Sequence, residues 1–194
     1  RLPSSIPSWR SLKPVYERLR QSRRFWEQRD FAIIDLAYSC GLRRCELAGL
    51  NVDDIDEQGS TIRVKGKGGR VRLVPIGAQA LKDVLYYIYH IRPRFIRTTH
   101  TKALFVSWLA GGKRMHTYSI NAVFRRLRGK YGFGKAFAPH KLRHAFATDL
   151  LRSGAPVQDV SKMLGHVKLE TTQVYTRLLP LDLKRQHERY HPRG

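Results

Sequence analysis

The feature that most constrains this chain is a long basic stretch that contains no acidic residue. Between Asp83 and Asp149 there is no Asp or Glu, while thirteen Lys or Arg side chains are interleaved with apolar residues at core-like spacing. Such a stretch has the residues to build a core, but it cannot neutralise its own charge. We therefore expect a polyanionic partner. Nucleic acid is the leading candidate, because neutralising backbone phosphates releases condensed counterions and supplies affinity independent of base sequence.

Composition agrees with a folded protein rather than a disordered basic tail. The 194 residues are 42% hydrophobic and carry a formal net charge of +22, so the chain is expected to form one domain with a real core. No apolar run approaches the roughly 20 residues that a membrane span needs, and the segment that starts at Arg1 lacks the apolar centre of a signal peptide. We expect a cytoplasmic protein without membrane contact, and we expect the chain to be a fragment of a longer one.

The two cysteines are expected to be reduced, with one of them buried. Cys40 and Cys45 stand five residues apart in one helical region, where their side chains point in different directions. Two thiols at this spacing also fall short of a structural zinc set, which requires four Cys or His ligands. The sequence therefore predicts neither a disulfide nor a cysteine-bound metal.

Apolar periodicity predicts an α+β fold that is mainly helical and carries a small antiparallel β-hairpin. Helices are expected over 24–39, 80–91, 118–130, 140–153, 156–164 and 169–178, the hairpin over 61–76, and a short strand over 103–108. Thr117 is predicted to cap one helix, Pro139 to lie in the first turn of the next, and Gly154 and Gly165 to end helices.

The two ends of the chain differ from its middle. Residues 1–10 are rich in Pro and Ser and resemble a linker, which leaves 11–179 as the domain. Residues 180–194 form a polar tail, in which a last helix over 181–190 is expected to pack on a partner.

Four segments carry basic, histidine and tyrosine groups that suit a phosphate. They contain Arg43, Lys67, His140 with Arg143, and His166 with Tyr175. Each signal has an ordinary alternative when it is taken singly. Arg43 could simply pair with Glu46 at i+3, Lys67 could be a solvated turn lysine, and Tyr175 could be a core or surface tyrosine.

Rival phosphate and metal motifs fail on inspection. The glycines of GKGGR match neither a nucleotide-binding loop nor a dinucleotide fingerprint. His140 and His144 have the i, i+4 spacing of a zinc pair but lack the glutamate of HExxH. The acidic residues over 53–57 imitate the start of a calcium loop, yet Lys65 stands where the bidentate glutamate is required. No metal or other cofactor is predicted.

In this order the segments resemble the catalytic domain of the tyrosine recombinase (phage integrase) family over essentially the whole chain, and specifically its Xer-like members. GLRRCELAGL is similar to the first arginine box, VKGKGGRVRLVPI to the lysine-bearing hairpin, PHKLRHAFATDLL to the HxLRH box, and LGHVKLETTQVYTRL to the nucleophile segment. Arg44 and Cys45 depart from the family pattern, without an expected effect on the chemistry. The resemblance also implies an amino-terminal DNA-clamping domain, which is absent from this sequence.

The resemblance implies a site-specific recombinase that cleaves and rejoins DNA through a 3′-phosphotyrosyl link without metal or ATP. The implied catalytic residues are Arg43, Lys67, His140, Arg143, His166 and the nucleophile Tyr175, with Glu46 and His144 in support. Expected DNA contacts are Arg70, Arg72, Lys113, Arg114, Arg125, Arg126 and Lys141.

The implied partners are double-stranded DNA with a specific site, further copies of the chain in a tetramer on paired sites, and a related recombinase; the tail would dock on a neighbouring subunit. The biological use could be chromosome or plasmid dimer resolution, or integration and excision of a mobile element. Two alternatives stay open: a type IB topoisomerase-like enzyme, and a basic DNA-binding protein without catalysis.

Overall fold

A computed structural model describes residues 9–96, 100–133, 137–165 and 187–193. The helices are α1 (Trp9–Arg20), α2 (Phe25–Ser39), α3 (Arg44–Gly49), α4 (Ala78–Tyr86), α5 (Thr117–Tyr131), α6 (Pro139–Arg152) and α7 (Val157–Leu164). The strands are β1 (Ile55–Asp56), β2 (Thr61–Lys65) and β3 (Val71–Pro75), with short 3₁₀ or π turns at Val52–Asp54, Lys67–Gly69, Tyr87–Ile91 and Arg92–Phe95. The expected mainly helical α+β architecture is confirmed.

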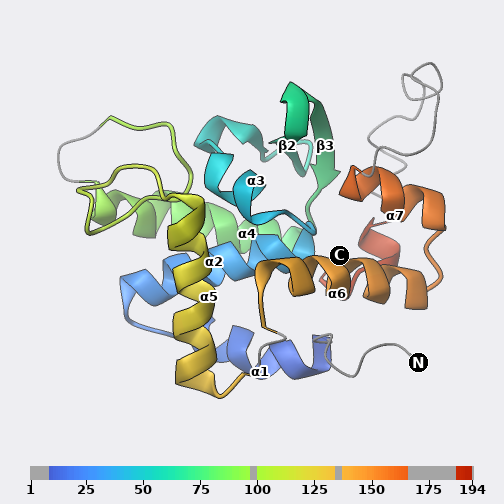
Figure 1. Cartoon of the computed structure of the whole chain (residues 1–194), viewed down its shortest axis with the longest axis horizontal. Coiled ribbons are helices and arrows are strands. Elements are labelled where there is room, and N and C mark those ends of the chain that lie inside the picture. The colour runs from blue at the N-terminus through green and yellow to red at the C-terminus, as the bar shows by residue number, and fades with distance from the viewer. Residues whose placement is uncertain (1–8, 97–99, 134–136, 166–186, 194) are drawn as a thin grey trace.

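Helix α2 forms the centre of the molecule. Nearly all of its side chains are buried, and α1, α4 and α6 pack around it (Figure 1). A helix that is buried on nearly all sides needs a mostly apolar sequence, which explains the strongly apolar pattern of 24–39. Its charged side chains are paired: Glu27 with Lys130, Asp30 with Arg29 and Arg126, and Asp35 with Arg193.

The predicted hairpin is confirmed, and it belongs to a three-stranded antiparallel sheet of order β1-β2-β3. In its register Ile62 lies opposite Val74 and Val64 opposite Arg72. Ile62, Val64 and Val74 are buried and face the core, whereas Val71 and Leu73, the alternating apolar residues of β3, are exposed. Strand β1 is not predicted by the sequence, because two residues give no period; the pair Ile55 and Ile62 places it at the edge.

Several helix boundaries differ from the prediction. Thr117 is the first residue of α5, and His116 is its cap residue. Helix α1 begins at Trp9, inside the segment predicted as a linker, because the Trp9 ring packs against Tyr16 and Tyr38. The predicted strand over 103–108 forms only isolated bridges, in which Ala103 pairs with Asn51 and Val106 with Arg114.

Other boundaries are confirmed. Pro139 opens α6, and Gly165 closes α7 in the left-handed conformation. The predicted helix over 169–178 lies outside the described residues. Cys40 is buried, Cys45 is exposed and both are free, as expected. None of the helices within the described ranges has the length and apolarity required to traverse a bilayer.

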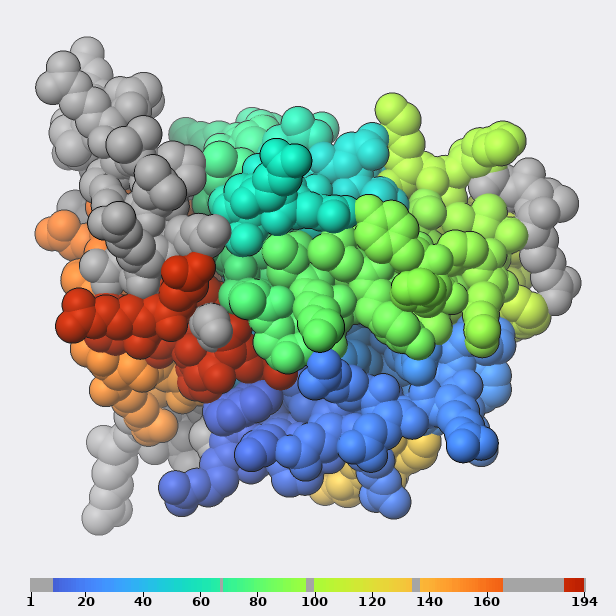
Figure 2. All heavy atoms as spheres, turned by 180° about the vertical axis from the view of Figure 1, so that it is seen from behind, coloured from blue at the N-terminus to red at the C-terminus, as the bar shows by residue number. Residues whose placement is uncertain are grey.

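The described part of the tail packs on the chain's own body. Residues 187–190 are helical, and the segment 187–193 lies against α6, α7 and α1 (Figure 2). Arg193 pairs with Asp35 and Asp83, two carboxylates that are themselves buried. The tail is thus partly a core element in this single chain, and its docking on a neighbouring subunit stays a prediction.

Candidate active site

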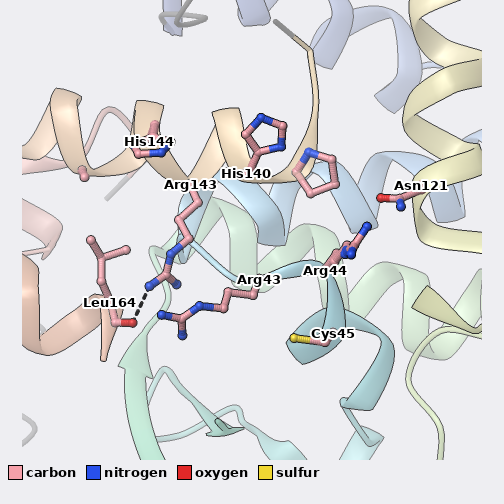
Figure 3. A pocket seen from close by; sticks show the side chains of 10 residues that line it. Arg43, Arg44, Cys45, Asn121, His140, Arg143, His144 and Leu164 are labelled. Carbon is pink, nitrogen blue, oxygen red and sulfur yellow. Dashed lines mark hydrogen bonds between the residues drawn. The ribbon is translucent and has the colours of Figure 1, made fainter. Parts of the chain in front are cut away.

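An open pocket of about 610 Å³ lies where the start of α3, the start of α5, α6 and the end of α7 meet (Figure 3). Four of the predicted site residues line it. The lining is made by Arg43, Arg44, Cys45, Asn121, Pro139, His140, Arg143, His144, Ala147 and Leu164. The lining holds three arginines and two histidines but no carboxylate. An anion is therefore the ligand that this pocket favours.

Arg43 is positioned by the turn that enters α3. Its backbone N–H donates to Glu46 Oε2 at 2.8 Å, and its Nη1 donates to Glu46 Oε1 at 3.0 Å. The preceding Gly41 has φ +60°, and a Cβ there would lie 2.6 Å from the Phe146 ring. Only glycine fits both the left-handed conformation and this close approach. The predicted Arg43–Glu46 pair is thus real, and it leaves the Arg43 side chain 40% exposed toward solvent.

Arg143 reaches the pocket from α6 and points toward Arg43 (Figure 3). Its Nη1 donates to Gly41 O at 2.7 Å and its Nη2 to Leu164 O at 2.5 Å. The next inward residue, Leu142, is fully buried, as predicted. Burial and the neighbouring Arg43 lower the pKa of Arg143 to about 10, so it stays cationic at neutral pH. Two guanidinium groups held close together, those of Arg43 and Arg143, favour the binding of an anion between them.

Glu46 joins three arginines beneath the pocket. Arg72 donates to both carboxylate oxygens, at 2.8 and 3.0 Å, Arg43 donates to Oε1, and Arg143 Nη1 lies 3.9 Å from Oε2. Burial alone would raise the pKa of Glu46, but the hydrogen bonds from Arg72 and Arg43 hold it below its usual value. Glu46 is therefore ionised, and the cluster of one carboxylate and three guanidinium groups keeps an excess of positive charge.

His140 and His144 lie on the exposed face of α6, and both line the pocket. Partial burial, together with Lys141, His144 and Arg44, lowers the pKa of His140 below 6.5. His140 is consequently neutral at pH 7 and able to accept a proton. No group of three His, Cys, Asp or Glu side chains with metal-binding geometry occurs within the ranges that the structure describes.

Three predicted catalytic residues have side chains outside the part of the chain that the structure describes. His166 and Tyr175 fall in the segment 166–186, and only the backbone of Lys67 is described, in the turn between β2 and β3. The segment that contains His166 and Tyr175 directly follows Gly165, the residue that ends α7 beside the pocket. Among the described residues the structure therefore brings together Arg43, His140 and Arg143 with their predicted supports.

The seven predicted DNA contacts divide into two groups. Arg70, Lys113 and Arg125 are exposed, and Lys141 is half-buried. The remaining three have partners within the protein: Arg72 binds Glu46 and Met163 O, Arg114 binds the carbonyls of Ala48 and Leu50, and Arg126 pairs with Asp30. Arg72 is largely covered by these contacts, whereas Arg114 and Arg126 are exposed beside theirs. DNA contact by the seven residues stays a prediction.

Besides apolar residues, three lining residues with polar or reactive side chains are missed by the sequence. Arg44 and Cys45 are expected to depart from the family pattern without affecting the chemistry, yet both face the pocket beside Arg43. Asn121 reaches the pocket from α5. The adjacency of Arg44 to Arg43 is a usable signal. Asn121 gives none, because a polar residue on an exposed helix face is ordinary.

Comparison with known proteins places this arrangement in a class. The sequence profile of the phage integrase family matches residues 15–181, and the chain belongs to that family. It is similar to the tyrosine recombinase XerC of Alcanivorax borkumensis, with 41% identity over 86% of this chain and 53% of the relative. It is also similar to the tyrosine recombinase XerD of Haemophilus influenzae, with 35% identity over 100% of this chain and 66% of the relative.

Solved structures agree on the fold. The XerA recombinase superposes with a TM-score of 0.68 at 32% identity, covering 94% of this chain and 65% of that one. The integrase from mycobacterium phage Brujita shares the fold at 24% identity, with a TM-score of 0.67 over 99% of this chain and 61% of its own. This chain spans about half the length of the curated relatives it matches first.

Proposed function

We propose that this chain is the catalytic part of a site-specific tyrosine recombinase. The observation that carries the proposal is the convergence of Arg43 and Arg143, from different elements, on one pocket that also holds a neutral His140. The relatives named tyrosine recombinase XerC and XerD support the same activity. The proposed substrate is a phosphodiester of double-stranded DNA, with which the net charge of +22 agrees.

In the proposed reaction the phenol oxygen of Tyr175 attacks the phosphorus, an O–P bond to tyrosine forms and the P–O5′ bond breaks. An unperturbed tyrosine has a pKa near 10, so only about one in a thousand is ionised at pH 7. The proton must therefore leave as attack proceeds, and His140 is the proposed acceptor. Lys67 is the proposed acid that gives a proton to the departing 5′ oxygen, and His166 a proposed donor to the phosphate.

Arg43 and Arg143 would bind the nonbridging oxygens of the phosphate. Their planar groups suit two-point contact, and they would offset the charge that accumulates in the transition state. The phosphotyrosyl ester conserves the energy of the broken bond, so a 5′-hydroxyl can reverse the reaction on a new strand without ATP. Strand exchange of this kind would take place between paired sites in a tetramer of this chain or with a related recombinase.

The activity is tested by incubating the protein with supercoiled plasmid that carries candidate sites captured from fragmented source DNA. The proposal predicts recombinant products from the wild type and none from Tyr175→Phe, with equal DNA binding by both proteins. Relaxed plasmid without recombinants would instead identify a topoisomerase-like enzyme. Equal DNA binding with no change in topology or connectivity by either protein would identify a DNA-binding protein without catalysis.

A further inference from the structure

Arg72 makes contacts that a DNA-binding residue does not need. Its side chain extends from β3 and is only 15% exposed. Nη1 and Nη2 bind the two oxygens of Glu46 at 2.8 and 3.0 Å, and Nε donates to Met163 O at 3.0 Å. One guanidinium group thus connects the hairpin that carries Lys67 with α3 and with the end of α7.

The end of α7 is held by two arginines on adjacent carbonyls. Arg72 binds Met163 O, and Arg143 binds Leu164 O. Gly165 follows with φ +64°, and a Cβ at Gly165 would lie only 3.0 Å from the Arg72 side chain. Arg72 and Arg143 together therefore fix the point at which the chain leaves α7 and continues in sequence toward Tyr175.

Arg72 also compensates the buried negative charge of Glu46. Glu46 is 1% exposed and ionised, and a buried carboxylate requires cationic partners. Arg72 binds both oxygens of Glu46. Arg143 Nη1 lies 3.9 Å from Glu46 Oε2, and Arg143 donates hydrogen bonds to two backbone carbonyls instead. Without Arg72, the nearest cations left to Glu46 are Arg43 and Arg143.

We propose that Arg72 is a positioning residue that neutralises Glu46 and so keeps Arg43 and Arg143 available for the phosphate. Arg72 acts through Glu46 and does not touch DNA. The inference rests on the proposed function for the identity of the anion, but the competition between Glu46 and an anion for the two arginines follows from the described contacts alone.

The test is a double-mutant comparison. Single-turnover cleavage of site DNA is measured at saturating DNA for wild type, Arg72→Gln, Glu46→Gln and the double variant. Arg72→Gln is expected to lower the rate about 100-fold, the usual effect of displacing catalytic groups by about 1 Å. Adding Glu46→Gln removes the competing charge, and the double variant is expected to recover at least about tenfold.

Arg63→Gln is the matched control, because Arg63 lies on the neighbouring strand β2 and pairs with Asp54 away from the pocket. Its cleavage rate is expected to stay within about twofold of wild type. A double variant that is as slow as or slower than Arg72→Gln would overturn the proposal. So would a loss of DNA affinity and of about one charge in its salt dependence that Arg72→Gln shows and that the double variant does not recover, because removing the Glu46 charge cannot restore a direct contact between Arg72 and a phosphate.

A second measurement separates this inference from the recombinase proposal. Inorganic phosphate that binds the pocket raises the melting temperature by an amount that grows with the ratio of its concentration to its Kd, whether or not the protein cleaves DNA. The phosphate-induced shift is expected to shrink in Arg72→Gln and to return in the double variant. If wild type forms no covalent product but this pattern holds, the recombinase proposal fails and the role of Arg72 stands. Equal shifts in wild type and Arg72→Gln would overturn the role of Arg72.

Discussion

At the residue scale, the arginines of this chain differ in whether the protein already occupies their donors. Arg43 keeps one face of its side chain open although it binds Glu46, whereas Arg72 has partners on all three of its nitrogens. Arg143 is intermediate: it is held by two backbone carbonyls and stays charged at neutral pH, with its pKa lowered to about 10 by burial and Arg43. The free donors of Arg43 and Arg143 define the place for an anion.

Replacing Arg143 by lysine should impair cleavage without unfolding the protein. A lysine keeps the charge but has no planar fork, so it cannot hold Gly41 O and Leu164 O while binding a phosphate. We expect a loss of about 3 kcal/mol in transition-state stabilisation, or on the order of 100-fold in rate. Single-turnover cleavage at saturating DNA measures this, with a melting curve as the folding control. A lysine variant that cleaves at the wild-type rate would show that the two-point contact is unnecessary.

Replacing Gly41 by alanine should destabilise the whole domain. The left-handed conformation disfavours any Cβ, and this one would collide with Phe146 at 2.6 Å. The expected loss is about 2 kcal/mol or more in the free energy of unfolding, measured by urea denaturation. Gly49→Ala is the control, because a Cβ at the end of α3 meets nothing within 4 Å and alanine favours helix. Equal stability of the two variants would contradict this explanation of Gly41.

The sequence points to Arg43, His140 and Arg143 because the segments that carry them occur together in one order, although each signal is weak singly; the structure brings the three residues to one pocket. It does not show that Arg72, Arg114 and Arg126 also bind groups of the protein itself. Their partners lie 26, 66 and 96 residues away along the chain, as the contacts with Glu46, Ala48 and Asp30 show. A local pattern carries no information about a carboxylate that only folding brings near.

At the element scale, predictions succeed where one apolar period spans a whole element. Helices α2, α5, α6 and α7 and the β2–β3 hairpin are predicted close to their observed bounds. Strand β1 and helix α1 are missed, since β1 is two residues long and α1 contains Pro14 next to a Pro- and Ser-rich segment. Both elements depend on tertiary contacts: β1 on pairing with β2, and α1 on the packing of Trp9.

Helix α5 offers a matched test of structural and DNA-binding arginines. Arg125 and Arg126 are both exposed, but Arg126 pairs with the fully buried Asp30 of α2, whereas Arg125 lies over the ring of Tyr118 on its own helix. Arg126→Ala is expected to lower the free energy of unfolding by about 1 kcal/mol, because the pair is half-exposed and Arg29 still holds Asp30. Arg125→Ala should leave stability unchanged and reduce DNA affinity, together with the slope of its salt dependence by about one charge.

Urea denaturation and DNA titration at several salt concentrations measure both effects. The opposite assignment, with Arg126→Ala affecting only DNA affinity and Arg125→Ala only stability, would show that the Asp30 contact does not hold α5 to α2.

At the scale of the whole molecule, the C-terminal segment closes the core. His187 donates from Nε2 to Ser39 O at 2.6 Å, His191 stacks on His187, and Arg193 reaches Asp35 and Asp83 between the rings of Trp9 and Tyr16. The sequence predicts only a polar tail for this segment, because charges and histidines resemble a solvated surface when their partners are distant. Residues from both ends of the chain thus meet at α2.

This closure makes stability depend on pH. Burial lowers the pKa of His187 to about 4, and burial together with His187 and Arg193 lowers that of His191. Folding therefore favours the neutral rings, so their contribution is complete above pH 6.5 and is lost as the pH falls toward 4. For His187 alone we expect a loss of about 2 kcal/mol between pH 7 and pH 5. Asp35 opposes this trend, because burial raises its pKa.

Urea denaturation at pH 7 and pH 5 tests the dependence, with His187→Gln/His191→Gln as the control. Glutamine keeps a hydrogen-bond donor but does not titrate, so the control should lose less stability than wild type over the same interval. An identical loss in both proteins would place the pH dependence in other groups.

The central claim is that this pocket holds a DNA phosphate for attack by Tyr175. The most direct measurement is to incubate the protein with nicked duplex site DNA, denature it, digest the covalent product with nuclease and trypsin, and map the modified residue by mass spectrometry. Trypsin releases Tyr175 in the peptide LETTQVYTR, which contains no other tyrosine. The account predicts a nucleotide on this peptide in wild type and its loss in Tyr175→Phe and in Arg143→Ala. A nucleotide on another residue, or an adduct that persists in Tyr175→Phe, would contradict it.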